Sequence, residues 1–149
     1  MDEDQVQPSA RIGVCPSCLV MGENDREQCG QGWHPLETWP PKIRWTKREA
    51  IAYLRIPPGT ALCIEALTQY PEIIGHPVLG RVVVNGEEAG TFRFDTGGWR
   101  VLRFQLPAQE DPGASEIRIL VDNPWIPSEV SSASDNRVLG IAVSRIWAE

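Results

Sequence analysis

The sequence lacks a long apolar run and is poor in lysine. No stretch of eighteen or more apolar residues occurs, which excludes a membrane-spanning helix. Lys42 and Lys47 are the two lysines, and 20 acidic residues against 14 basic ones give a net charge of −6. Nucleic acids and anionic membranes favour a basic face, so we expect neither as a partner. The start, MDEDQVQPSA, has neither the basic n-region nor the apolar h-region of a secretory signal, which predicts a cytoplasmic protein.

The sequence is also poor in candidate catalytic groups. It has two histidines, His34 and His76, and no G-x-S-x-G elbow of the kind that accompanies a Ser-His-Asp triad. It contains neither G-x-x-x-x-G-K-[ST] nor G-x-G-x-x-G, so nucleotide binding has no support. The adjacent acids Glu87 and Glu88 follow an Asn-Gly pair, and we expect them to face solvent in a turn. We therefore predict a protein without enzymatic activity.

Short runs that alternate between apolar and polar residues are abundant from Ile43 onward. Period-two alternation is typical of strands with one buried face, and Asn85-Gly86 predicts a two-residue hairpin turn. Seven or eight such strands predict an all-β fold, an antiparallel β-sandwich of the jelly-roll kind. The residues expected to face the core are Ala52, Leu54, Ile56, Leu62, Ile64, Ala66, Phe92, Phe94, Leu102, Phe104, Leu106, Ile117, Ile119, Val121, Leu139, Ile141 and Val143.

Residues 1–31 carry three of the four cysteines and show no periodicity. We expect an irregular arm here, metal-bound or disordered, with the sandwich domain spanning residues 32–149. Cys15, Cys18, Cys29 and His34 have the spacing C-x2-C-x10-C-x4-H and would suit a tetrahedral zinc ion. The spacing lacks the second C-x-x-C that makes a zinc ribbon convincing, so a disulfide and free thiols remain alternatives.

Half of the six tryptophans lie in one stretch, WHPLETWPPKIRW, at residues 33–45. Exposed indole rings stack on the apolar faces of sugars, and Trp39 and Trp125, both flanked by proline on at least one side, are the candidates for such a ligand site. The alternative is that the segment closes one end of the sandwich with Trp33 and Trp45 in the core, and for Trp45 we favour burial.

Asp135 and Arg137 precede the last predicted strand in a polar loop. As ligand-binding residues, together with Glu37, they would offer a carboxylate and a guanidinium fork to sugar hydroxyls. As structural residues, Arg137 would pair with an acid such as Glu37 and join the two ends of the sandwich. We favour the structural role, because a planar bidentate pair suits a fixed tie.

Three pieces of the sequence resemble one family in their order and spacing. They are Gly32-Trp33 through Glu37, Arg44-Trp45-Thr46, and Asp135-x-Arg137-x-Leu139-Gly140. Together with the strands between them, over residues 32–148, they resemble the small jelly-roll domains, similar to carbohydrate-binding modules, found beside bacterial glycosyltransferase and methyltransferase modules. The resemblance implies a non-catalytic module whose partner is a glycan or a glycan-building enzyme in polysaccharide biosynthesis. It does not extend to residues 1–31.

A second function class stays open at this point. An interaction or assembly domain with no sugar ligand would use its apolar loops against another protein and would present a flat apolar patch of several hundred Å². A glycan-binding module would instead present a concave site with exposed tryptophan and arginine. The sequence does not decide the oligomeric state.

Overall fold

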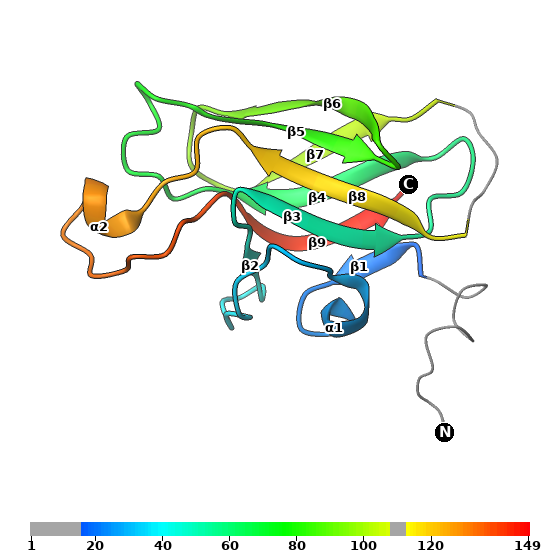
Figure 1. Ribbon diagram of the computed structural model, residues 1–149, viewed down its shortest axis with the longest axis horizontal. Coiled ribbons are helices and arrows are strands. Elements are labelled where there is room, and N and C mark those ends of the chain that lie inside the picture. The colour runs from blue at the N-terminus through cyan, green and yellow to red at the C-terminus, as the bar shows by residue number, and fades with distance from the viewer. Residues whose placement is uncertain (1–15, 108–112) are drawn as a thin grey trace.

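Two antiparallel β-sheets stack face to face in the computed structural model, which describes residues 16–107 and 113–149 (Figure 1). Sheet A has the strand order β1 (Cys18–Val20), β9 (Ala142–Ala148), β4 (Ala61–Leu67), β7 (Arg100–Gln105), and β2 (Arg44–Trp45) pairs with β9 beside β1. Sheet B has the order β3 (Glu49–Leu54), β8 (Ser115–Val121), β5 (Val78–Val84), β6 (Glu87–Phe94). Two one-turn helices, α1 (Asp25–Gln28) and α2 (Pro127–Val130), lie outside the sheets. The predicted antiparallel β-sandwich is confirmed.

The main core fills the space between the sheets and follows the period-two pattern of the sequence. Leu54, Ile64, Phe94 and Ile117 are fully buried in it, one from each of four strands. The polar residues between them face outward, as Tyr53 shows on β3. For residues 50–56, 61–67 and 116–121, the side chains predicted to face the core are therefore confirmed as buried.

The hairpin between β5 and β6 turns at the predicted dipeptide. Asn85 and Gly86 have φ values of 51° and 84°, the two positive angles that a type I′ turn requires. The Asn85 side chain accepts a hydrogen bond from the Glu116 amide at 2.8 Å, which ties the turn to β8. The local sequence signal and a long-range contact thus fix the same turn.

A second buried cluster covers the outer face of sheet A. Trp45, Ala142 and Leu67 are cross-strand neighbours on β2, β9 and β4, and Ile43, Trp125 and Leu139 pack with them. This corrects one prediction, that Leu139 shares a core face with Ile141 and Val143. Leu139 precedes β9 and pairs with Trp125 in an isolated bridge, so it joins the outer cluster.

Part of the segment predicted to be an irregular arm is incorporated in the sandwich. β1 pairs with β9, and Leu19 and Met21 are buried in the main core. In α1, burial raises the pKa of Asp25, but the hydrogen bond from Arg44 Nε at 2.7 Å, two backbone hydrogen bonds and the charge of Arg44 together outweigh it, and the net shift is downward. Residues 1–15, including Cys15, lie outside the described residues. Among the residues that are described, no helix has the length and apolar character needed to cross a bilayer.

Candidate functional site

The tryptophan-rich stretch forms an irregular hairpin at the edge of sheet A. His34 and Trp45 are joined by a backbone hydrogen bond of 2.9 Å, and Glu37 and Ile43 exchange two, at 2.9 and 3.0 Å. The peptide bond between Pro40 and Pro41 at its tip is cis. Prolines have no backbone N–H to donate, and the short pairing of β2 with β9 anchors the stretch to the sheet together with its aromatic rings.

Those rings form a continuous aromatic cluster on the outer face of sheet A. Trp45 meets Trp39 edge-on with ring centroids 6.0 Å apart, and meets Trp125 edge-on at 5.8 Å. Tyr70 extends the cluster at 5.5 Å from Trp125. The predicted burial of Trp45 is confirmed at 2% exposure.

Trp125 does not fit its predicted place in an exposed ligand site. Its side chain is 8% exposed and its indole N–H donates to the Gly140 carbonyl at 3.3 Å. The nearby Pro124 and Pro127 suggested a surface loop, but the bridge between Trp125 and Leu139 holds that loop over the sheet. Trp39 is half-buried, so part of its ring remains available on the surface.

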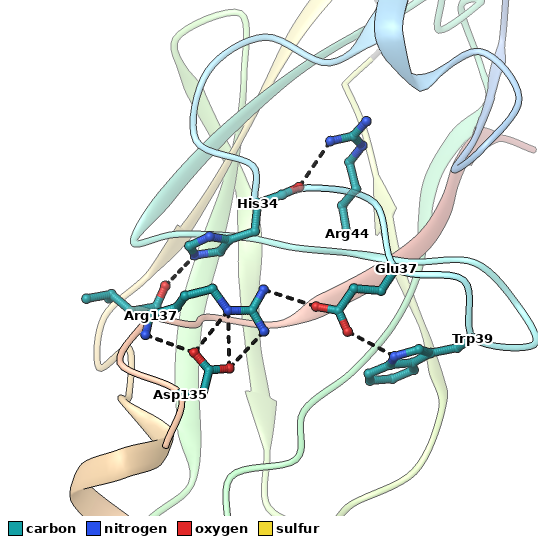
Figure 2. Close-up of polar contacts among 7 residues, drawn as sticks. His34, Glu37, Trp39, Arg44, Asp135 and Arg137 are labelled. Carbon is teal, nitrogen blue, oxygen red and sulfur yellow. Dashed lines mark hydrogen bonds and ion pairs between the residues drawn. The ribbon is translucent and has the colours of Figure 1, made fainter. Parts of the chain in front are cut away.

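Arg137 connects the last loop to the entry hairpin, as predicted. Its guanidinium donates to Glu37 Oε2 at 3.0 Å and holds Asp135 through three contacts of 2.8 to 3.1 Å (Figure 2). The hydrogen bond from Arg137 lowers the pKa of Asp135 to about 2, and the same contact raises the pKa of Arg137. The predicted Arg137–Glu37 pair is confirmed.

Most polar groups in this network form hydrogen bonds with other groups of the same network. The second oxygen of Glu37 accepts the Trp39 indole N–H at 3.0 Å, and His34 Nε2 lies 2.7 Å from the Val138 carbonyl oxygen (Figure 2). The structure therefore brings together four of the five predicted ligand-binding residues, Glu37, Trp39, Asp135 and Arg137. Because their donors and acceptors are satisfied internally, the arrangement favours the structural role over sugar recognition.

The predicted zinc site gains no support. Cys18 lies on β1 opposite Trp147, whereas Cys29 pairs with Ala52 on the edge of sheet B, and His34 is engaged by Val138. Burial raises the pKa of Cys29 to about 12, so its thiol stays protonated. Within residues 16–107 and 113–149, no three His, Cys, Asp or Glu side chains form a metal-binding group, and Cys18, Cys29 and Cys63 are free thiols.

A groove along the edge of sheet B has the features expected of a ligand site. Residues 30–33 run beside β3, where Gly30 and Gln31 exchange backbone hydrogen bonds with Ile51 at 2.7 and 2.9 Å. A Cβ on Gly32 would come within 1.8 Å of the Glu49 carbonyl oxygen, so the close approach requires glycine. The resulting hollow of about 690 Å³, which we call the β3 groove, is lined by Gly30, Gln31, Gly32, Trp33, Lys47, Glu49, Ile51 and Arg118.

The β3 groove combines a fixed aromatic ring with a polar rim. Trp33 is half-buried against the main core, and its indole N–H donates to the Ile51 carbonyl at 2.9 Å, which fixes the ring. Arg118 pairs with Glu116 and with Glu49, and the hydrogen bonds that it donates to these carboxylates raise its pKa. Within the described part of the chain, Lys47 has no ion-pair partner, so its ammonium is available to a ligand.

Sequence reasoning missed this groove. From the sequence, Trp33 was considered only as a core residue that closes one end of the sandwich, and Gln31 belonged to the predicted arm. The alternation predicted the inward positions Ala52 and Leu54 of β3. What the sequence did not show is that residues 30–33 pair with this edge.

Comparison with known proteins confirms the resemblance at the level of fold. No family model and no curated protein matches the sequence. Among solved structures, a family 35 carbohydrate-binding module from an environmental isolate has a TM-score of 0.58 at 10% identity, covering 89% of this chain and 91% of that one. A family 36 module solved with calcium and xylotriose has a TM-score of 0.54 at 11% identity, covering 89% and 98%.

A third neighbour is the CBM36-1 domain of a multidomain xylanase from the hindgut metagenome of Trinervitermes trinervoides, with a TM-score of 0.52 at 11% identity. It covers 83% of this chain and 91% of that one. The chain has the jelly-roll fold of carbohydrate-binding modules. At this level of identity the likeness extends to the fold and not to a ligand.

Proposed function

We propose that this protein is a non-catalytic module that binds a glycan in the β3 groove. The observation that carries the proposal is the fixed, half-buried ring of Trp33 in an open hollow rimmed by Gln31, Lys47 and Glu49. A pyranose ring has apolar faces and a polar equator. An indole suits the first, and an amide, an ammonium and a carboxylate suit the hydroxyls of the second.

The groove favours binding over catalysis. Glycoside hydrolysis uses two carboxyl groups on opposite sides of the scissile bond. Among the described residues that line the groove, the one carboxylate is Glu49, and Arg118 pairs with it. The described lining of the groove therefore lacks the second carboxyl group that this reaction uses.

The fold neighbours bear on the kind of ligand, and the sequence resemblance bears on the enzyme beside which the module would act. One neighbour is described with calcium and xylotriose, which supports a glycan as the kind of ligand. Among the described residues no three His, Cys, Asp or Glu side chains form a metal-binding group, so calcium is not part of the proposal. The sequence resemblance supports a place beside a glycan-building enzyme, as an accessory module in polysaccharide biosynthesis.

The β3 groove is tested by binding of neutral oligosaccharides to matched variants. We expect a panel of xylan, glucan and mannan oligosaccharides, measured by isothermal titration calorimetry, to contain a ligand of the wild-type protein. Trp33→Phe keeps an apolar ring but loses the indole N–H and area, and Gln31→Ala removes a rim amide; each should weaken binding about tenfold.

The control for these variants is Trp147→Phe, which changes a half-buried tryptophan on the outer face of sheet A. It should bind like the wild type. If the groove variants also bind like the wild type while a ligand is found, the β3 groove is not the site. If no glycan binds and the protein forms a stable oligomer or hetero-complex, the assembly-domain alternative replaces the proposal.

A further inference from the structure

A second groove lies on the opposite side of the sandwich from β3. β6 and β7 are edge strands of sheets B and A, and they run along the same side of the molecule (Figure 1). The two strands touch where a Cβ on Gly90 would come 2.7 Å from the Phe104 ring. Beyond that contact they separate around a hollow of about 460 Å³, which we call the seam groove.

The seam groove is cationic in an acidic protein. Arg93, Arg100 and Arg103 line it together with a single acid, Asp95, which leaves a net charge of +2. The whole chain carries −6, so this concentration of positive charge is local. A positive hollow in a negative surface attracts an anion to one place and repels an extended polyanion elsewhere.

Arg100 is held in place across the seam. Its guanidinium lies over the Phe94 ring, 5.1 Å from the centroid, and donates from Nη1 to the Arg93 carbonyl. Stacking on an aromatic face and one hydrogen bond orient the planar fork. The other N–H groups of the fork remain for a ligand, because a guanidinium has five donors.

The other two arginines are weakly paired. Arg93 lies 3.4 Å from Asp95 and Arg103 lies 3.8 Å from Glu149, and all four side chains are more than half exposed. Exposed pairs at such distances contribute little to stability. By contrast, Arg137 makes all its ion-pair contacts at 2.8 to 3.1 Å. A ligand can therefore recruit Arg93 and Arg103 at small cost.

We propose that the seam groove binds the oxyanion of an acidic glycan, a carboxylate or a sulfate group carried on the sugar chain. Arg100 provides the oriented fork, and Arg93 and Arg103 complete the charge. Val101, which lines the groove and is 51% exposed, offers an apolar surface to the sugar ring. The inference rests on the proposed function in one respect, that the protein binds glycans, and assigns a second site and a ligand class.

The test compares acidic and neutral probes by isothermal titration calorimetry. The probes are trigalacturonate for carboxylate, a heparin-derived tetrasaccharide for sulfate, xylotriose as the neutral sugar, inorganic sulfate, and a single-stranded DNA 20-mer. We expect one acidic oligosaccharide to bind, with an affinity that falls as salt rises. Arg100→Gln should weaken it about tenfold or more.

Two further variants keep the result interpretable. The double variant Arg93→Gln/Arg103→Gln should also weaken the acidic probe about tenfold or more, and it tests the groove even if Arg100→Gln fails to fold. The control Arg145→Gln removes one positive charge from β9, which β4 separates from β7 and which does not line the seam groove, and it should bind within twofold of the wild type. Equal losses in Arg145→Gln and Arg100→Gln would show a general charge effect and overturn the site.

The remaining outcomes separate this inference from the proposed function. If neutral sugars bind and depend on Trp33 while acidic probes bind no more tightly, the seam site falls and the β3 groove stands. If acidic probes bind in an Arg100-dependent way and Trp33→Phe changes nothing, the seam site stands alone. Binding of inorganic sulfate or of the DNA as tight as that of the acidic oligosaccharide overturns the assignment to a glycan.

Discussion

Replacing Arg137 with alanine should destabilise the fold without touching either groove. Arg137 joins residues that are 100 positions apart, and its removal leaves Glu37 and Asp135 without their cation. The three side chains are 36%, 27% and 30% exposed. Breaking a buried pair costs about 3–5 kcal/mol, and an exposed pair contributes about 0–1 kcal/mol. For this exposure we expect a loss of about 2 kcal/mol.

The measurement is urea unfolding followed by tryptophan fluorescence, with a thermal scan beside it. A loss of this size should lower the melting temperature by about 4–8 °C in a chain of this length. Glu37→Gln should cost less, since Asp135 still holds Arg137, and the double variant should cost about 1 kcal/mol less than the sum of the two single variants. Arg93→Ala, which removes a loosely paired arginine, should stay within about 0.5 kcal/mol of the wild type.

One result would refute the structural role of this network. If Arg137→Ala unfolds at the same urea concentration as the wild type and at the same time abolishes glycan binding, the residues in Figure 2 form a ligand site after all. In that case the internal hydrogen bonds of the network would be those of the unliganded state, and the sugar would replace them.

Three further predictions follow from individual side chains. The pKa of Asp135 is depressed to about 2, so its contribution to stability is present above its unfolded pKa near 4 and is lost as the pH falls toward 2. The difference in unfolding free energy between the wild type and Asp135→Asn, measured by urea unfolding, should therefore decrease as the pH falls from about 4 to about 2. Above about pH 5 this difference should stay constant. Gly80→Ala should cost about 3 kcal/mol or more, because its Cβ would lie 2.3 Å from the Leu120 carbonyl oxygen; Gly97→Ala, with nothing within 4 Å, should be neutral. Alkylation at pH 8 with peptide mapping should modify the exposed Cys18 well before Cys29, whose raised pKa and burial suppress the thiolate; equal rates would contradict the placement of Cys29.

Much of the fold could be predicted because its main signals are local. Alternation along a strand identifies the buried face without reference to its partner, and Asn85-Gly86 identifies a turn from two residues. The Arg137–Glu37 pair is long-range, yet it was predicted because each residue precedes a terminal strand and the fold brings such strands together. Each of these inferences requires only the sequence of one strand, the sequence of one turn, or knowledge of the fold topology.

What could not be predicted depends on pairing between distant segments. β1 has three residues, too few to show a period, and exists because β9 offers it an edge. β4 is buried on both faces, and the aromatic cluster covers its end at Leu67, so alternation alone does not predict its burial. The zinc hypothesis treated the cysteines as one arm, whereas the chain separates Cys18 and Cys29 between the two sheets.

The two grooves lie at opposite edges of the sandwich, and the two edges differ in whether a further segment pairs with them. On the β3 side, residues 29–33 add an irregular strand to sheet B, and its glycines bring the backbone close enough to leave a hollow beside Trp33. On the β6–β7 side no strand of the described chain is added, and Arg93, Arg100 and Arg103 line the hollow between the two edge strands. Charged side chains on an open edge also discourage pairing with a second chain. The same arginines therefore protect the edge and define its ligand, so Arg93→Val/Arg103→Val should both lose acidic glycan and increase self-association in sedimentation experiments.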